Sequence, residues 1–130
     1  MGAFGTSHRF RAAALIGLGT ALAPLDTAVN VALPGMTGGF GLPLGGAQWI
    51  VIAYVLTYAS LLLAIGRIGD LFGHLAIFRF GLLWSAAALL LCAVAPSYAW
   101  LLVGRFAQGI GTALVLACGP ALLTSLYGER

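Results

Sequence analysis

The chain alternates long apolar stretches with short polar breaks. A helix needs roughly 20 residues to cross about 30 Å of hydrocarbon. Four apolar stretches reach this length, at approximately residues 12–34, 47–66, 76–95 and 100–126. The pattern predicts an all-α membrane protein with four transmembrane helices. A short segment over residues 1–11 precedes them, and residues 127–130 would begin a loop.

The arginines orient these predicted helices. Five of them lie before the first stretch, around the break between the second and third, or after the fourth: Arg9, Arg11, Arg67, Arg79 and Arg130. The loops over residues 35–46 and 96–99 carry no charge. Because positively charged loops favour the cytoplasmic side, we predict a multi-pass protein of the cell (inner, cytoplasmic) membrane with both termini in the cytoplasm. The polar break over residues 67–75, predicted as a short turn, would also be cytoplasmic.

Composition supports the membrane interpretation. Hydrophobic residues make up 62% of the 130 residues and charged residues only 7%, whereas a soluble domain carries roughly 25% charged residues. The net charge of +3 comes from scattered arginines, which do not form the basic face that nucleic acid requires. Cys92 and Cys118 are far apart and lie in apolar stretches, so we expect them to be buried hydrophobic residues.

The residues suggest no chemistry of bond making or breaking. The chain has no nucleotide-binding loop, no metal-ligand cluster and no nucleophile–base set. We therefore expect no enzyme and no bound cofactor or metal. The expected partners are the lipid bilayer and a small-molecule substrate of unknown identity, and nucleic acid is not among them.

One alternative concerns the first stretch. His8–Arg11 followed by the apolar residues 12–23, which end in Ala-Leu-Ala, resembles a signal peptide with a cleavage site. The apolar stretch nevertheless continues through residues 29–33, and all that follows is also apolar enough to span a membrane. The uncleaved transmembrane helix is the preferred interpretation.

Two charged residues lie deep inside predicted membrane helices, whereas Arg79 is only three residues from the start of the third. Asp26 is eight residues before Pro34, and Arg105 is five residues after Trp100. A charge near a helix centre costs roughly 2.5–3.5 kcal/mol on insertion scales, so such residues indicate function. At 1.5 Å per residue, the two charges lie about 12 Å and about 8 Å below the outer surface. They could form an ion pair, or each could face a separate polar pocket.

Small and polar residues share one helix face with each charge. In the first stretch these are Gly19, Ala23, Asp26 and Asn30. In the fourth they are Arg105, Gln108, Gly109 and Thr112. We predict that Asn30 and Gln108 line a transport pathway, and that Gly109 and Gly111 allow close helix packing.

The two middle stretches differ in polarity. Tyr54 and Tyr58 give the second stretch a mildly polar face. These tyrosines could line the transport pathway, or they could simply pack with a hydroxyl partner. Beyond Arg79 near its start, the third stretch has only Trp84 and Ser85 as polar exceptions and is predicted to face lipid. The unequal polarity favours a transport pathway over a passive anchor.

Three motifs in order resemble the amino-terminal part of a major facilitator superfamily transporter. Residues 105–113 (RFAQGIGTA) match the fourth-helix motif R-x-x-Q-G-x-G-x-A. Residues 66–73 (GRIGDLFG) resemble the loop motif G-x-L-x-D-R-x-G-R-[KR]. Residues 25–34 (LDTAVNVALP) resemble the first-helix motif of the multidrug:proton antiporter branch, usually built with fourteen helices. The resemblance covers residues 15–130.

The resemblance implies roles for individual residues. Asp26 and Arg105 would couple transport to protons, with the proton gradient as the energy source. The resemblance further implies a conformational loop motif made of Gly66, Asp70 and Gly73. The sequence departs from the loop motif where Leu71 replaces its first basic residue and residues 74–75 replace its basic pair.

The resemblance also implies proton-coupled efflux of small molecules or drugs by alternating access between two six-helix halves. Four helices are one three-helix repeat and the first helix of the next, so we expect a truncated, split or incompletely assembled chain whose further partners are the remaining transporter helices. Two alternatives stay open. One is a non-transporting membrane fragment or interaction module. The other is a four-helix exporter that acts as a dimer, like the small multidrug resistance proteins.

The proton-coupling role of Asp26 gives a first prediction. Asp26→Asn removes the titratable carboxyl and should abolish proton-coupled efflux in the complete transporter, measured as drug efflux with and without a proton gradient. Unchanged coupling would contradict the assignment.

Overall fold

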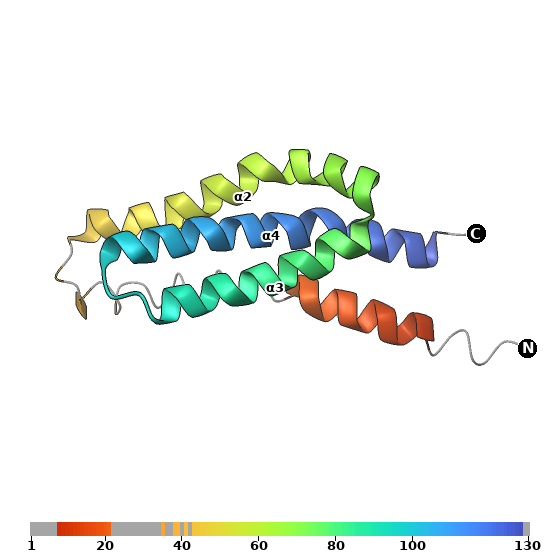
Figure 1. Ribbon diagram of the computed structural model, residues 1–130, viewed down its shortest axis with the longest axis horizontal. Helices are drawn as coiled ribbons and strands as arrows, with labels where there is room; N and C mark the ends of the chain where they lie inside the picture. The colour runs from red at the N-terminus through yellow and green to blue at the C-terminus, as the bar shows by residue number, and fades with distance from the viewer. Residues whose placement is uncertain (1–7, 22–34, 36–37, 40, 42, 129–130) are drawn as a thin grey trace, which may run out of the picture.

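The computed structural model describes residues 8–21, 35, 38–39, 41 and 43–128, and these residues form an antiparallel arrangement of helices (Figure 1). Residues 8–21 are helical. The three long helices are α2 (Leu44–Phe72), α3 (His74–Ala93) and α4 (Tyr98–Tyr127). All three are long and apolar enough to cross a membrane. The all-α prediction is therefore confirmed, while residues 22–34 of the first predicted span lie outside the described residues.

Helix α4 is the centre of this arrangement. It packs along both α2 and α3, which have few contacts with each other. In the most apolar 18-residue segment of each helix, 50% is buried in α4, against 22% in α2 and 17% in α3. Figure 1 accordingly shows α4 between the other two helices. The third helix, predicted to face lipid, is thus only slightly more exposed than α2.

Glycines on two faces of α4 allow both neighbours to approach. A Cβ atom at Gly109 would lie 2.9 Å from the backbone oxygen of Tyr54 on α2. A Cβ at Gly104 would lie 2.7 Å from the sulfur of Cys92 on α3, and one at Gly111 would collide with Ser85. Without side chains at these positions, the two neighbouring backbones come close enough for extensive van der Waals contact.

The helical segment over residues 8–21 packs near the carboxyl half of α4. Ile16 is buried in a cluster with Phe78, Val115 and Cys118. A Cβ at Gly119 would lie 2.6 Å from the hydroxyl oxygen of Thr20. The segment is thereby fixed against both α3 and α4 through small residues and apolar side chains.

The junction between α2 and α3 corrects one prediction. The turn expected over residues 67–75 is wrong, because α2 continues to Phe72 and α3 begins at His74. Only Gly73 separates the helices, with φ at +93°, and its N–H donates to the Gly69 carbonyl at 2.9 Å. A left-handed φ costs glycine little, so one residue suffices to reverse the chain. The polar residues before it end the apolar stretch without ending the helix.

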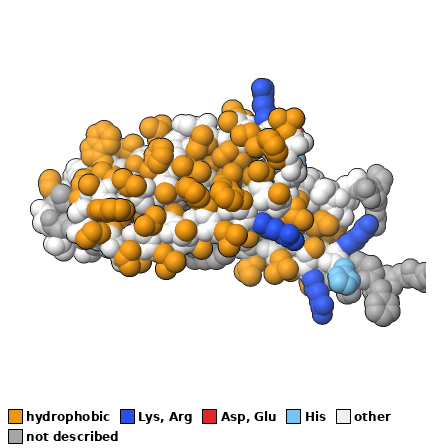
Figure 2. Space-filling model, viewed as in Figure 1, with side chains coloured by type: hydrophobic (Ala, Val, Ile, Leu, Met, Phe, Trp, Pro, Cys, Tyr) orange, Lys and Arg blue, Asp and Glu red, His pale blue; other side chains and the backbone are white. Residues whose placement is uncertain are grey.

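The surface separates apolar from charged regions. Hydrophobic side chains cover most of the visible face, and arginine and histidine side chains gather at the end where α2 meets α3 (Figure 2). Leu63, Leu83 and Leu90 are 84%, 74% and 69% exposed. Among the described residues on this face, an apolar surface with charges gathered at one end is typical of a membrane-embedded bundle.

The contact at Gly109 gives a prediction about stability. Gly109→Ala should destabilise the protein by about 1–3 kcal/mol, because the new methyl group meets the α2 backbone. The matched control is Gly66→Ala in α2, where a Cβ meets no atom within 4 Å, and the better helix propensity of alanine should stabilise by about 0.5–1 kcal/mol. Reversible unfolding in mixed detergent micelles, followed by circular dichroism, measures both. Equal shifts for the two variants would contradict this packing.

Candidate functional site

The side chain of Arg105 is buried in the middle of the helix arrangement. It is 1% exposed, and it lies on α4 with Gln108, which is fully buried. Its Nη1 donates a hydrogen bond of 2.8 Å to Oε1 of Gln108. Its Cζ lies 5.2 Å from the ring centroid of Tyr54 on α2, within the range of a cation–π contact. The guanidinium is therefore held by an amide oxygen and an aromatic face.

Tyr54 connects this arginine to a second polar residue on α4. The Tyr54 hydroxyl donates to Oγ1 of Thr112 at 3.2 Å, and the two residues are 3% and 2% exposed. Its ring also packs against Tyr58, with centroids 5.3 Å apart. We call Tyr54, Arg105, Gln108 and Thr112 the Arg105 cluster.

Helical spacing explains how the cluster assembles. Gln108 and Thr112 follow Arg105 at i+3 and i+7, so the three side chains lie along one face of α4. Gly109 falls on the same side and brings the α2 backbone close. The Tyr54 ring can then contact the guanidinium with its face and reach Thr112 with its hydroxyl.

The sequence-predicted pathway residues fall into two groups. Arg105, Gln108 and Tyr54 come together, and Tyr58 lies beside Tyr54. Asp26 and Asn30 lie outside the described residues, so the Asp26–Arg105 pair stays a prediction. Within the part of the chain that the structure describes, no three His, Cys, Asp or Glu side chains come together as a metal site.

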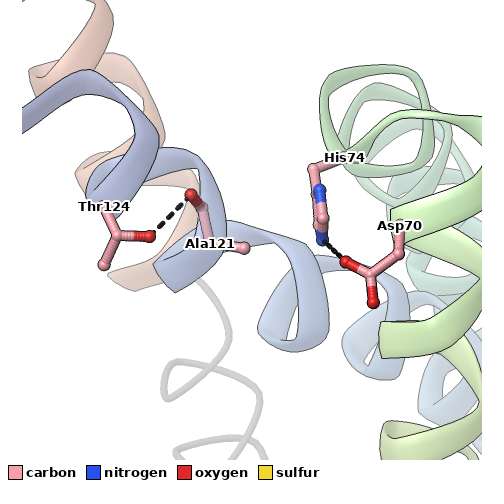
Figure 3. Close-up of polar contacts among 4 residues, drawn as sticks. All are labelled: Asp70, His74, Ala121 and Thr124. Carbon is pink, nitrogen blue, oxygen red and sulfur yellow. Dashed lines mark hydrogen bonds and ion pairs between the residues drawn. The ribbon is translucent and has the colours of Figure 1, made fainter. Parts of the chain in front are cut away.

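The loop-motif residues form a separate site at the junction of α2 and α3. Asp70 Oδ1 lies 3.3 Å from Nε2 of His74 (Figure 3), and the Asp70 side chain is 73% exposed. Gly66 has open space around it, and Gly73 is the junction itself. Because the Asp70 side chain is mostly exposed, this ion pair contributes little stability.

Asp70 lies at the edge of a groove between α2 and α4. The groove has a volume of about 780 Å³, and its lining combines polar and apolar residues. Residues that line it include Ser60, Leu63, Arg67, Asp70 and Leu116.

Comparison with known proteins decides the family. A profile of the Major Facilitator Superfamily matches residues 11–130. The chain belongs to this superfamily. The resemblance to this superfamily is therefore confirmed.

Individual relatives in this superfamily are antibiotic resistance and export proteins. The chain is 41% identical to the methylenomycin A resistance protein of Bacillus subtilis over 114 residues, which cover 87% of this chain and 24% of the relative. It is 37% identical to the puromycin resistance protein of Streptomyces alboniger, covering 79% and 20%. It is 36% identical to the cephamycin export protein of Amycolatopsis lactamdurans, covering 83% and 22%. The chain thus spans less than a quarter of the length of each of these relatives.

The sequence did not predict two hydrogen bonds that join neighbouring helices. Trp84 on α3 donates through Nε1 to the Ala107 carbonyl on α4 at 2.7 Å. Tyr98 at the start of α4 donates to the Gly46 carbonyl of α2 at 2.8 Å. The available signal was the residue type, because tryptophan and tyrosine in apolar surroundings need a partner for their polar atom. The sequence does not reveal which carbonyl supplies it.

The hydrogen bond between Arg105 and Gln108 gives the next prediction. Gln108→Leu removes an acceptor from a buried charge at nearly constant volume, and should cost about 1.5–3 kcal/mol of unfolding free energy. Gln48→Leu is the matched control, because Gln48 is exposed and its replacement should change stability by less than about 0.5 kcal/mol. Unfolding in detergent micelles measures both. A loss at position 108 no larger than at position 48 would show that the bond contributes nothing.

Proposed function

We propose that this chain forms the amino-terminal part of a proton-coupled exporter of small drug-like molecules. The observation that carries the proposal is Arg105, a charged side chain that is 1% exposed within a membrane-spanning helix. A charge at such a position is costly and is typically kept for ion or substrate movement. Membership of the superfamily supports transport as the activity.

The proposed coupling uses Asp26 as the proton carrier. When Asp26 is ionised, its charge attracts the Arg105 guanidinium across the membrane interior. When a proton neutralises Asp26, that attraction is lost, and the contacts with Gln108 and Tyr54 hold the guanidinium on α4. The two states differ in how strongly the first helix is drawn to α4. Together with the remaining transporter helices, this difference would bias alternating access.

The proposed substrate class is small organic antibiotics. The relatives carry the names of methylenomycin A, puromycin and cephamycin, which are chemically different compounds. We choose one of these three antibiotics, puromycin, as the probe for transport. The proposed orientation places the junction of α2 and α3 in the cytoplasm, because arginine side chains gather there (Figure 2).

Uptake into everted membrane vesicles tests this function. Vesicles that contain the transporter should accumulate puromycin only while a proton gradient is present. Arg105→Gln removes the buried charge and should reduce this accumulation at least tenfold, and Arg105→Lys should fail to restore it because lysine lacks the planar guanidinium. Arg79→Gln is the matched control, since Arg79 is exposed, and it should transport normally.

Three results would contradict the proposal. They are puromycin accumulation that persists after a protonophore collapses the gradient, full activity of Arg105→Gln, and an absence of transport for every antibiotic in this class. The last result would favour a membrane fragment without transport activity.

A further inference from the structure

Tyr54 contacts α4 at two points through one rigid ring. The centroid of the ring lies 5.2 Å from Cζ of Arg105, and the hydroxyl at its far end donates to Thr112 at 3.2 Å. Arg105 and Thr112 are two turns apart on α4. The ring therefore lies along the Arg105 cluster and is fixed at the hydroxyl end by Thr112. At 3% exposure it has little room to rotate away.

The two described contacts of the guanidinium have different directions. Gln108 accepts a hydrogen bond from Nη1, in the plane of the group. The Tyr54 ring engages the group as a π surface. An in-plane contact alone permits rotation about the hydrogen bond, whereas an aromatic ring restricts that rotation. Together they fix the direction in which the N–H groups of Arg105 point.

The position of Tyr54 is itself tied to the α2 backbone. The Tyr54 carbonyl oxygen would be only 2.9 Å from a Cβ at Gly109, so the two helices touch at this residue. Any shift of α2 along α4 must move the ring relative to Arg105. A change in the position of α2 would therefore alter the surroundings of the Arg105 guanidinium through Tyr54.

We infer that Tyr54 is a positioning residue that orients the Arg105 guanidinium through its aromatic face, while Thr112 holds the ring in place. The consequence for transport rests on the proposed function. The orientation of the guanidinium is independent of the proposed function and can be measured separately. The aromatic ring is the essential part, so phenylalanine should replace tyrosine at position 54 and leucine should not.

Nuclear magnetic resonance of the protein in lipid nanodiscs tests the orientation. The Nε–Hε resonance of Arg105 is assigned by its loss in Arg105→Lys. Tyr54→Leu should remove the ring-current shift of this resonance and speed its hydrogen exchange with water about tenfold, as expected for the loss of one desolvated cation–π contact. Tyr54→Phe and Thr112→Val both remove the hydrogen bond between these two side chains, so each should keep the shift while broadening the resonance.

Tyr98→Leu is the matched control. It also replaces a tyrosine that joins α2 to α4, but its hydroxyl bonds to Gly46, and the Arg105 resonance should not change. If Tyr54→Leu does not fold, trifluorophenylalanine at position 54 keeps the shape of the ring and weakens its negative face. Exchange at Arg105 should then be several-fold faster than in Tyr54→Phe.

Transport supplies a second readout that a purely structural role would not change. The pH profile of puromycin uptake should shift in Tyr54→Leu and stay unchanged in Tyr54→Phe and Tyr98→Leu. A structural defect alone would lower uptake by the same factor at every pH.

The two readouts separate the two claims. The inference is overturned if the Arg105 resonance is the same in Tyr54→Leu as in the unmodified protein, or if Tyr98→Leu changes it equally. If the resonance responds as expected but uptake in the unmodified protein ignores the proton gradient, the positioning role stands and the proposed function fails.

Discussion

The arrangement of the helices depends on keeping one guanidinium group inside a membrane-spanning helix. Lipid offers a charge almost no solvation, so Arg105 can only be kept where protein surrounds it. Its 1% exposure shows that α4 is covered at this point. An amide oxygen from its own helix and an aromatic face from α2 replace part of the lost hydration. These contacts require α2 to pack closely against α4 at Arg105.

Close packing in turn explains the distribution of small residues on α4. Apolar side chains gain little from meeting each other in lipid, so helices associate through tight contact and cross-helix hydrogen bonds. Gly109 serves the contact with α2 and Gly111 the contact with α3, while the Trp84–Ala107 bond adds a polar link to α3. The surroundings of the buried charge and the packing of the bundle therefore both depend on the same residues of α4. The ion pair between Asp70 and His74, at the end of the bundle, is separate from the Arg105 cluster.

Local patterns in the sequence predicted most features that depend on a single helix, with the end of α2 as the exception. Apolar length predicted the membrane helices, and spacing placed Gln108 beside Arg105. Contacts between helices were beyond such patterns: Tyr54 could equally have lined a pathway, and its placement on Arg105 depends on how deeply α2 settles at Gly109. The predicted turn after residue 66 failed for a related reason. Polar residues mark where an apolar stretch ends, whereas the helix ends only where Gly73 adopts a positive φ.

In the proposed function, the buried charge of Arg105 couples drug movement to proton movement. The most direct measurement is proton flux driven by a puromycin gradient, in proteoliposomes that contain the transporter and an entrapped pH indicator. We expect that puromycin leaving the vesicles acidifies their interior, and that Arg105→Gln abolishes this signal. Puromycin efflux without any pH change, or an equal pH change in Arg105→Gln, would contradict it.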